Sequence, residues 1–324
     1  MKVIRRLGSW DLIVLLALAL VVVIGASTIE GVASPRFWRF VTLEVIPIAI
    51  VALPLTLVII TGEIDLSVAS VMGLTCAVMG DLWAHGVTSL PVLVVLSLLL
   101  GAVLGAVNGL FVTVFGLPSL AVTIGTLALY RGLAYVVLGD RAISDYPDSW
   151  TSGSTRAIPG LTIPWFIIVV AVLAVLFAVV LHATPIGRGL YAMGNNAEAA
   201  RFAGVAVGRT KFWLFVTTST MSALAGVFWT FRFASARADN ANGLELAVVA
   251  AVLLGGVSIF GGRGGLLGVL GAVVLICVLR NALQLASVPE NTLTIVTGSL
   301  LIASVVGPNA VAMARERLRR RRPA

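Results

Sequence analysis

The sequence predicts an all-α integral membrane protein with about ten transmembrane helices. The 324-residue chain is 59% hydrophobic and only 11% charged, whereas soluble proteins carry about 25% charged residues. Its mean hydropathy is +1.08. Apolar runs recur along the whole chain, and most of them approach the ~20 residues that a helix needs to cross the hydrocarbon core of a bilayer.

Five of the predicted spans lie in the first half of the chain. The first follows a short basic stretch and resembles a signal peptide, but we expect it to remain as an uncleaved span because many further spans follow. Pro47 and Pro54 should break or bend the second span. The five runs are Trp10–Ser27, Val41–Ile60, Val68–Trp83, Pro91–Phe115 and Pro118–Leu138.

A polar loop over residues 139–163 separates these runs from the other five. Cys76 and Cys277 lie in apolar runs, so we interpret them as buried single thiols and expect neither a disulfide nor a metal site. No soluble stretch is long enough to be an enzyme, and residues 1–324 should form a single transmembrane domain. The remaining runs are Pro164–Leu181, Phe212–Phe233, Leu244–Phe260, Gly265–Leu283 and Thr292–Val306.

The basic residues predict the orientation of the chain. Ten spans place both termini on one side of the membrane, and the side richer in Lys and Arg is cytoplasmic. With cytoplasmic termini, that side holds 14 of the 22 basic residues: Lys2, Arg5, Arg6, Arg188, Arg201, Arg209, Lys211, Arg263, Arg315, Arg317, Arg319, Arg320, Arg321 and Arg322. The net charge of +8 therefore indicates topology and contact with the lipid bilayer rather than nucleic acid. Residues 308–324 become a basic cytoplasmic tail.

A weak internal repeat suggests that the two halves are related. DLSVASV at residues 65–71 is similar to ELAVVAA at 245–251, and LPSLAVTIGTL at 117–127 is similar to VPENTLTIVTGSL at 288–300. The repeat would relate spans 2–5 to spans 7–10, an offset of five, so the two copies would be inverted. Inverted repeats are common in transporters, although chance similarity between apolar helices remains an alternative.

Several polar residues fall at membrane depth. Carboxylates there are costly, so they are candidates for contact with a transported solute. Helix capping by Asp65 and hydrogen bonding between helices are the structural alternatives. The candidates for the translocation pathway are Glu63, Asp65, Ser67, Asn108, Arg131, Glu245 and Asn281.

The segment 183–211 is the longest polar interruption in the second half. Asn195 can cap a helix there, Glu198 follows three residues later, and Gly204 can end it. Such a helix is too short to be stable alone, because about 12–15 residues are needed in water. We therefore expect a cytoplasmic docking element. The chain has no GxxxxGK[ST] motif, so any nucleotide hydrolysis would be the work of a partner.

Several blocks resemble the permease subunits of bacterial ABC sugar importers, in the ribose, autoinducer-2 and rhamnose-type branch. Glu198-Ala199-Ala200 followed by Gly204 resembles the EAA---G signature of such permeases, although the usual I-x-L-P is absent downstream. TGEIDLSVAS at 61–70 resembles GGIDLSVGS, with Glu63 in place of a glycine. PIGRGLYAMGNNAEAARFAGV at 185–205 is also similar to that branch.

The resemblance implies a permease of the bacterial plasma membrane that pairs with a second copy or a paralogue. Partner ATPase subunits would bind ATP and Mg²⁺, and an extracytoplasmic binding protein would deliver the sugar. This chain itself would bind no cofactor, and it would carry no catalytic residue. Segment 183–211 becomes a cytoplasmic coupling loop, and the ATPase contacts would be made by Glu198, Ala199, Ala200, Arg201, Phe202 and Gly204.

Other classes of protein remain possible from the residues. An ion-coupled secondary transporter could use Glu63, Asp65 or Glu245, but it would not need a docking helix at 183–211. A branched-chain amino-acid ABC permease should lack the IDLS block. A non-transporting scaffold predicts no loss of uptake when the gene is deleted.

Overall fold

The computed structural model describes residues 9–289, 291–303 and 306. Within these residues the regular secondary structure is entirely helical, apart from two isolated β-bridges. The predicted all-α class is thereby confirmed. The predicted basic tail at 308–324 lies outside the described residues. The helices are α1 (Ser9–Thr28), α2 (Pro35–Ile60), α3 (Val68–Ala84), α4 (Leu90–Thr113), α5 (Ser119–Leu138), α6 (Asp148–Thr155), α7 (Ile167–Ala183), α8 (Pro185–Asn195), α9 (Ala197–Phe202), α10 (Val207–Phe233), α11 (Leu244–Leu254), α12 (Leu266–Leu285) and Asn291–Ala303.

Ten apolar helices occupy the ten predicted runs. Six are long and apolar enough to cross a membrane, and the bent pair α7–α8 could form a seventh span. The other three, α3, α11 and Asn291–Ala303, are shorter. Helix α11 ends at Leu254, earlier than predicted, because Gly255 and Gly256 follow and Gly256 adopts a φ of 91°. The sequence did not predict α6 or α8.

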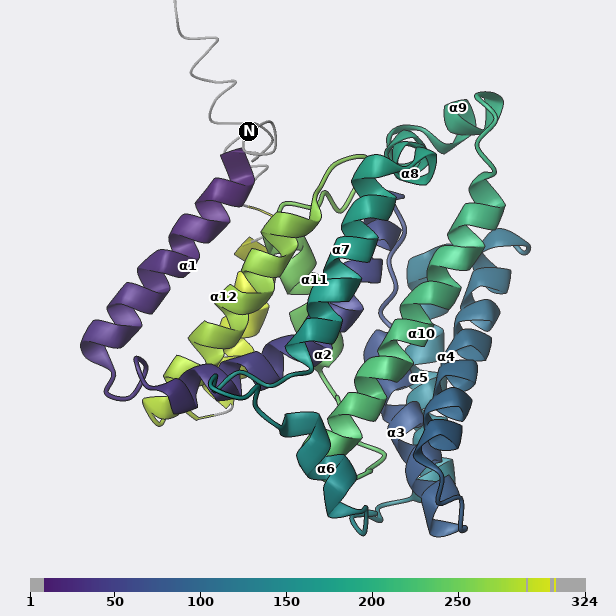
Figure 1. The fold of residues 1–324 in the computed structure, drawn as a ribbon. Coiled ribbons are helices and arrows are strands. Elements are labelled where there is room, and N and C mark those ends of the chain that lie inside the picture. The colour runs from purple at the N-terminus through teal and green to yellow at the C-terminus, as the bar shows by residue number, and fades with distance from the viewer. Residues whose placement is uncertain (1–8, 290, 304–305, 307–324) are drawn as a thin grey trace, which may run out of the picture.

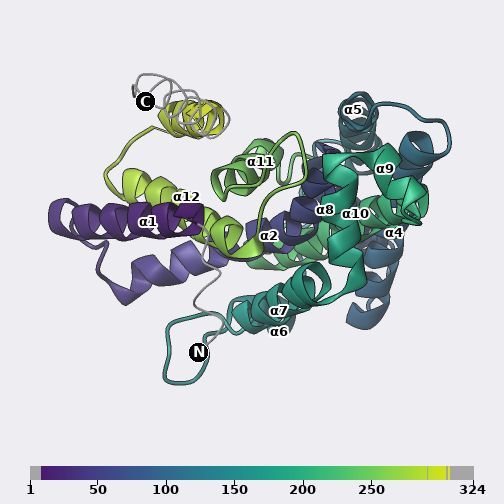
Figure 2. The ribbon, with the colours of Figure 1, turned by 90° about the horizontal axis from the view of Figure 1, so that it is seen from above.

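Helix α2 forms the centre of the molecule. It packs against α7, α10, α11 and α12, and nearly every residue from Val45 to Ile60 is buried. Pro47 and Pro54 lie inside one continuous helix, which changes direction along its length (Figure 1). Seen from above, α1 and α12 lie on one side of α2, and α4, α5 and α10 lie on the other (Figure 2).

Helices α4 and α10 are in close contact because one face of α4 carries glycines. A Cβ placed on Gly105 would lie 2.5 Å from the carbonyl oxygen of Phe215, and one on Gly101 would lie 2.7 Å from that of Ser219. Small residues allow helix backbones to approach where lipid provides no hydrophobic driving force. This contact fixes α10, which runs along most of the molecule.

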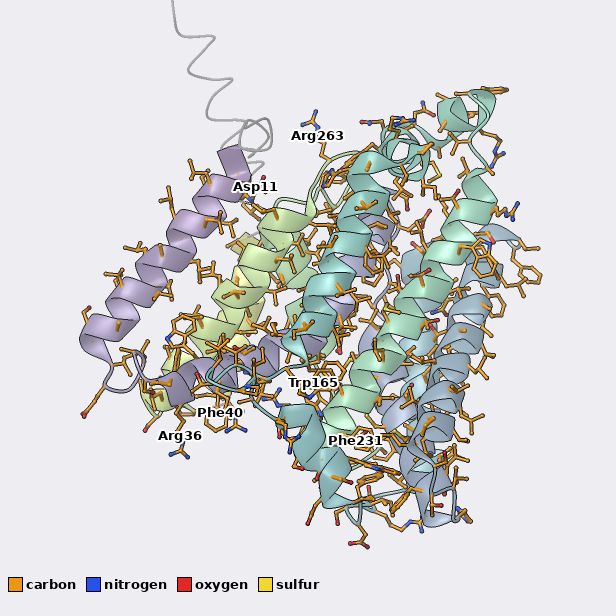
Figure 3. The ribbon with its side chains drawn as sticks, viewed as in Figure 1. Asp11, Arg36, Phe40, Trp165, Phe231 and Arg263 are labelled. Carbon is orange, nitrogen blue, oxygen red and sulfur yellow. The ribbon has the colours of Figure 1, made fainter. Side chains whose placement is uncertain are left out.

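The two ends of the molecule differ. Helices α8 and α9 lie at one end, together with the start of α1, and α6 lies at the other (Figure 1). Arg263, which the charge pattern assigned to the same side as the 183–211 segment, lies at the α8–α9 end, whereas Arg36 lies far from it (Figure 3). The end that carries α8 and α9 is called the α9 end below, and the opposite end is called the α6 end.

The short helices α3 and α11 run in opposite directions. Trp83, near the end of α3, lies against Trp150 of α6, with ring centroids 5.3 Å apart. The carbonyl of Leu254, at the end of α11, accepts a hydrogen bond from Trp10 at the start of α1, 2.9 Å away. Helix α3 therefore points to the α6 end, and α11 points to the α9 end. Both follow a non-helical stretch, at 61–67 and 234–243.

Candidate functional site: the α9 end and the polar residues beneath it

The 183–211 segment forms two helices at the α9 end. Asn196 caps α9, since its side-chain oxygen accepts a hydrogen bond from the backbone N–H of Ala199 at 2.9 Å. The cap is thus one residue later than predicted, because Asn195 ends α8 and donates its amide to the carbonyl of Tyr191. Gly204 follows α9 with a φ of 87°, as a residue that ends a helix requires.

Helix α9 exposes most of the residues predicted to contact an ATPase. Phe202 is 86% exposed, the highest value among the large apolar side chains that the structure describes. The exposed members of the predicted set are Glu198, Ala199, Arg201, Phe202 and Gly204, whereas Ala200 is buried. The exposed residues form a small surface, called the α9 surface below, with an aromatic ring beside one acidic and one basic side chain.

Helix α8 anchors this surface to the rest of the molecule. The Tyr191 hydroxyl donates to the carbonyl of Gly264 at 2.8 Å. Gly194 touches the end of α2 so closely that a Cβ there would lie 1.9 Å from the carbonyl oxygen of Ile60. The same carbonyl accepts a hydrogen bond from the N–H of Gly262. Helix α8 is therefore in contact with the end of α2 and with the turn between α11 and α12.

An ion pair joins the start of α10 to the stretch that precedes α3. Lys211 donates to the carboxylate of Glu63. Their side chains are 17% and 16% exposed, so water screens the pair only partly. Glu63 stands where the sugar-permease motif has glycine, and its partner comes from the segment that follows α9. The predicted pathway residue Glu63 thus lies beneath the α9 surface.

Asp65, Ser67, Asn108 and Tyr130 form a buried polar cluster. One oxygen of the Asp65 carboxylate accepts hydrogen bonds from the Ser67 N–H at 2.9 Å and the Ser67 hydroxyl at 2.6 Å. The Asn108 amide donates to the Ser67 hydroxyl at 2.9 Å. The Tyr130 hydroxyl donates to the carbonyl of Leu104 at 3.0 Å and lies 3.4 Å from the Asn108 side-chain oxygen. Three predicted pathway residues therefore meet, and their bonds fix the start of α3.

The stretch before α3 is also held by α5. The N–H of Ile64 donates to the Ser119 hydroxyl at 3.1 Å, and the Thr123 hydroxyl donates to the carbonyl of Ile64 at 3.2 Å. A non-helical backbone at membrane depth needs such partners, because lipid offers none. Residues 61–67 are therefore connected to α4, α5 and α10 at once.

The other predicted pathway residues lie apart from this cluster. Arg131 donates to the carbonyls of Ala238 and Asn240, at 2.7 and 2.8 Å, and to that of Ala69 at 3.2 Å, so it joins α5 to the stretch before α11. Glu245 occupies the first turn of α11 and is half-buried. In the described part of the chain, Glu245 forms no hydrogen bond or ion pair with the Asp65 cluster.

The predicted pathway residue Asn281 belongs to a charged group whose acidic member, Glu44, the sequence analysis missed. It donates to the carboxylate of Glu44, and the Arg280 guanidinium lies 3.7 Å from the same carboxylate. Arg232 donates to the carbonyl of Leu43, the residue before Glu44, at 2.8 Å. Glu44 is the only acidic residue within the second apolar run, and that isolation is the signal that could have identified it.

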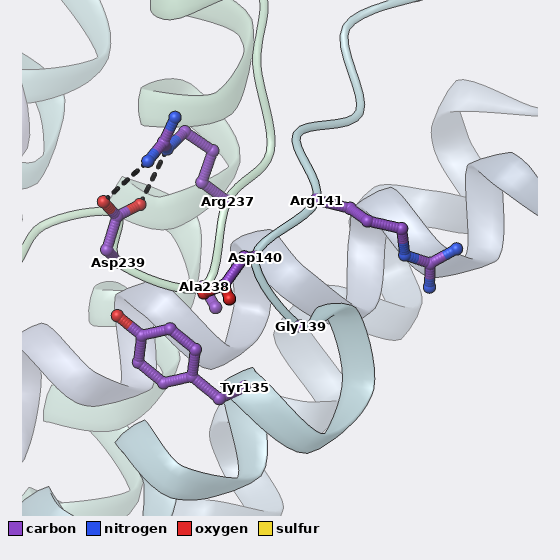
Figure 4. Close-up of a pocket in the computed structure, with 7 residues that line it drawn as sticks. All are labelled: Tyr135, Gly139, Asp140, Arg141, Arg237, Ala238 and Asp239. Atoms are coloured by element: carbon purple, nitrogen blue, oxygen red, sulfur yellow. Dashed lines mark hydrogen bonds and ion pairs between the residues drawn. The ribbon is translucent and has the colours of Figure 1, made fainter.

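A large cavity opens toward the α6 end. Its volume is about 740 Å³, and it lies among the end of α10, residues 235–243, the start of α11, Arg280 and helix Asn291–Ala303. A second pocket of about 50 Å³ lies beside it and shares Arg237 and Asp239 (Figure 4). Within the described residues, no three His, Cys, Asp or Glu side chains gather as a metal site would require.

Comparison with known proteins identifies the family. A family model described as "Branched-chain amino acid transport system / permease component" matches residues 38–305, from α2 to the last described helix. The chain belongs to this family of inner-membrane permeases. No solved structure matches the chain.

Curated relatives within the family agree over nearly the whole chain. The autoinducer 2 import system permease protein LsrD of Yersinia enterocolitica is 35% identical over 318 residues, which cover 95% of this chain and 93% of that protein. LsrD of Salmonella paratyphi A is 34% identical and covers 86% of each chain. LsrD of Escherichia coli O9:H4 is 33% identical over 96% of this chain and 95% of the relative. The resemblance to permeases of ABC sugar importers is thus confirmed.

Proposed function

We propose that this chain is the membrane-spanning subunit of an ATP-driven importer for a sugar-like solute. The observation that carries the proposal is the identity of 33–35% to autoinducer 2 import permeases over nearly the full chain. The exposed α9 surface supports it independently, because a permease without a nucleotide motif needs a place where an ATPase can act.

The predicted orientation belongs to the same proposal. If α3, α11 and Asn291–Ala303 each complete a pass, ten alternating helices place both termini on the side of the α9 surface. The excess of Lys and Arg predicted for that side makes it the cytoplasmic one. The opposite directions of α3 and α11, each after a polar stretch, support the inverted repeat. The α6 end then faces the outside, where a binding protein would deliver solute. A second permease copy or a paralogue would complete the pathway.

In this scheme the α9 surface couples the ATPase to the membrane helices. Force on α9 reaches α2 through Gly194 and Ile60, and it reaches the stretch before α3 through Lys211 and Glu63. That stretch fixes the start of α3 through Asp65 and its partners. The ATPase can shift the permease between two states only if it binds one state more tightly than the other. The contacts named above would connect that difference in affinity to the membrane helices.

The test is to replace Phe202 by Ser in the complete importer. Burying a Phe side chain at an interface contributes about 1.5–3 kcal/mol, so ATPase binding should weaken about tenfold or more. ATPase copurification and ATP-dependent uptake should both fall. Phe40→Ser is the control, because Phe40 is exposed far from the α9 end (Figure 3) and its replacement should leave ATPase copurification intact. Normal ATPase binding by Phe202→Ser would contradict the proposed docking surface.

A further inference from the structure

The 740 Å³ cavity at the α6 end has the size and chemistry of a site for a small solute. Sites for small molecules occupy about 300–1,000 Å³ and combine apolar walls with a few polar groups. The apolar lining includes Trp229, Phe233, Leu244, Leu246 and Leu293, and the polar lining includes Ser235, Asn240, Asn242, Thr294 and Thr297. None of these residues was a candidate from the sequence.

Two aromatic rings form one wall. The Trp229 and Phe233 rings lie with centroids 5.0 Å apart on consecutive turns of α10. The Arg232 guanidinium lies 4.7 Å from the Phe233 centroid and 5.9 Å from that of Trp229, and it also donates to Leu43. These contacts limit the movement of the rings. A large apolar ring face suits the C–H face of a sugar ring.

Amide and hydroxyl groups supply the rest of the recognition. Asn242 is exposed at the cavity, and the side chain of Asn240 donates to the carbonyl of Ser235 at 3.2 Å, which leaves its oxygen as an acceptor. Amides and hydroxyls both donate and accept hydrogen bonds, as the hydroxyls of a sugar do. Carbohydrate is therefore the class of ligand that matches this lining.

The charged groups of the lining are already paired with each other or with residues behind it. Arg237 and Asp239 form a two-bond ion pair, at 2.8 and 2.9 Å (Figure 4). Arg280 lies beside Glu44. A zwitterionic amino acid needs an anionic and a cationic partner, and Arg237 and Asp239, each about half exposed, already bond each other. A phosphorylated sugar likewise needs unpaired cations.

We propose that this cavity binds a neutral polyhydroxylated solute and selects it against amino acids and sugar phosphates. The proposal rests on the proposed function for its direction of transport, but the site itself does not require the ATPase.

A labelling experiment tests the cavity directly. Cys76 and Cys277 are both buried, so a single Cys placed in the cavity should dominate the reaction with a membrane-impermeant maleimide. Asn242→Cys and Ser235→Cys are the probes, and Ser152→Cys on the exposed face of α6 is the control. The variants are labelled in right-side-out vesicles from cells that express the complete importer, with D-ribose, L-rhamnose, L-leucine or ribose 5-phosphate present.

Neutral sugars should protect Asn242→Cys and Ser235→Cys but not Ser152→Cys. At a sugar concentration about ten times its Kd, labelling should slow about tenfold, because only the unoccupied fraction reacts. Protection by L-leucine or ribose 5-phosphate as strong as that by the sugars would overturn the proposed selectivity. A lack of protection by either sugar, or a disulfide between two copies at Asn242→Cys, would overturn the site.

ATP-dependent uptake in the same vesicles separates this inference from the proposed function. Trp229→Leu should raise the KM for sugar and Trp229→Phe should restore it, with ATPase copurification unchanged in both. Protection without ATP-dependent uptake by the unmodified importer would contradict the proposed function but support the cavity. ATP-dependent uptake with the KM unaffected by Trp229→Leu would contradict the cavity alone.

Discussion

The contact between α8 and α2 gives the sharpest prediction for the α9 end. In Gly194→Ala, the new Cβ would lie 1.9 Å from the carbonyl oxygen of Ile60 and 2.2 Å from the nitrogen of Gly262, where contacts under 3.0 Å essentially never occur. The opposing atoms are backbone, so α8 must move by about 1 Å rather than rotate a side chain. That movement should also break the hydrogen bond from Gly262 to Ile60.

The cost can be worked from these contacts. Overpacking costs about 1–3 kcal/mol, and loss of one hydrogen bond costs about 0.5–1.5 kcal/mol. Alanine favours the helix by about 1 kcal/mol relative to glycine, so the net loss is about 2 kcal/mol. Gly208→Ala is the matched control, because a Cβ there has no neighbour within 4 Å and the φ is not positive. Gly208→Ala should leave stability unchanged or raise it.

A thiol-reactive dye measures both variants during heating. Cys76 and Cys277 are buried, so their reaction reports unfolding. Gly194→Ala should lower the melting temperature by several degrees and reduce ATP-dependent uptake. Equal melting temperatures and uptake for Gly194→Ala, Gly208→Ala and the unmodified protein would refute the close contact between α8 and the end of α2.

Two further predictions concern charged pairs. Glu63→Lys and Lys211→Glu should each reduce ATP-dependent uptake, and the double exchange should restore most of it, with a coupling free energy of about 1–2 kcal/mol; additive losses in the double variant would refute a role for the pair. Arg237 holds the pKa of Asp239 below its ordinary value, so the pair stabilises the folded state at neutral pH and this contribution is lost as the pH falls through the lowered pKa. The melting temperature of Asp239→Asn should therefore be slightly lower than that of the unmodified protein at pH 7, and the two melting temperatures should converge below about pH 4. A difference in melting temperature that does not depend on pH would contradict this.

The length of the apolar runs predicted the helices, because a segment buried in lipid must form its backbone hydrogen bonds within itself. What it missed depends partly on contacts between distant parts of the chain. Helix α8 begins after a Thr184 cap with Pro185 as its first residue, a local signal that the sequence contains. Its position depends on distant contacts, because Gly194 and Tyr191 meet the end of α2 and the turn at Gly264. Helix α11 ends at Leu254, before the end of the predicted run at Phe260. The Gly255–Gly256 pair is the local sequence signal for that end.

The candidate site was predicted in part. The hydrogen bonds between Asp65 and Ser67 are local, but the bond from Asn108 to Ser67 follows from the packing of α3 against α4. The sequence showed that Glu63 stands at a glycine position of the sugar-permease motif. Only the fold showed that Lys211 is its ion-pair partner. The cavity around Trp229 was missed because its lining comes from three separated stretches, 229–247, Arg280 and 293–298, and an aromatic residue in an apolar run carries no special signal.

Uptake by the reconstituted importer tests the central claim most directly. Proteoliposomes would contain this permease, its permease partner if there is one, and the ATPase, with the binding protein outside and ATP inside. Sugar uptake should require ATP and the ATPase and should be unchanged by a protonophore. Uptake that persists without the ATPase and collapses with the proton gradient would contradict the account and would identify an ion-coupled transporter instead.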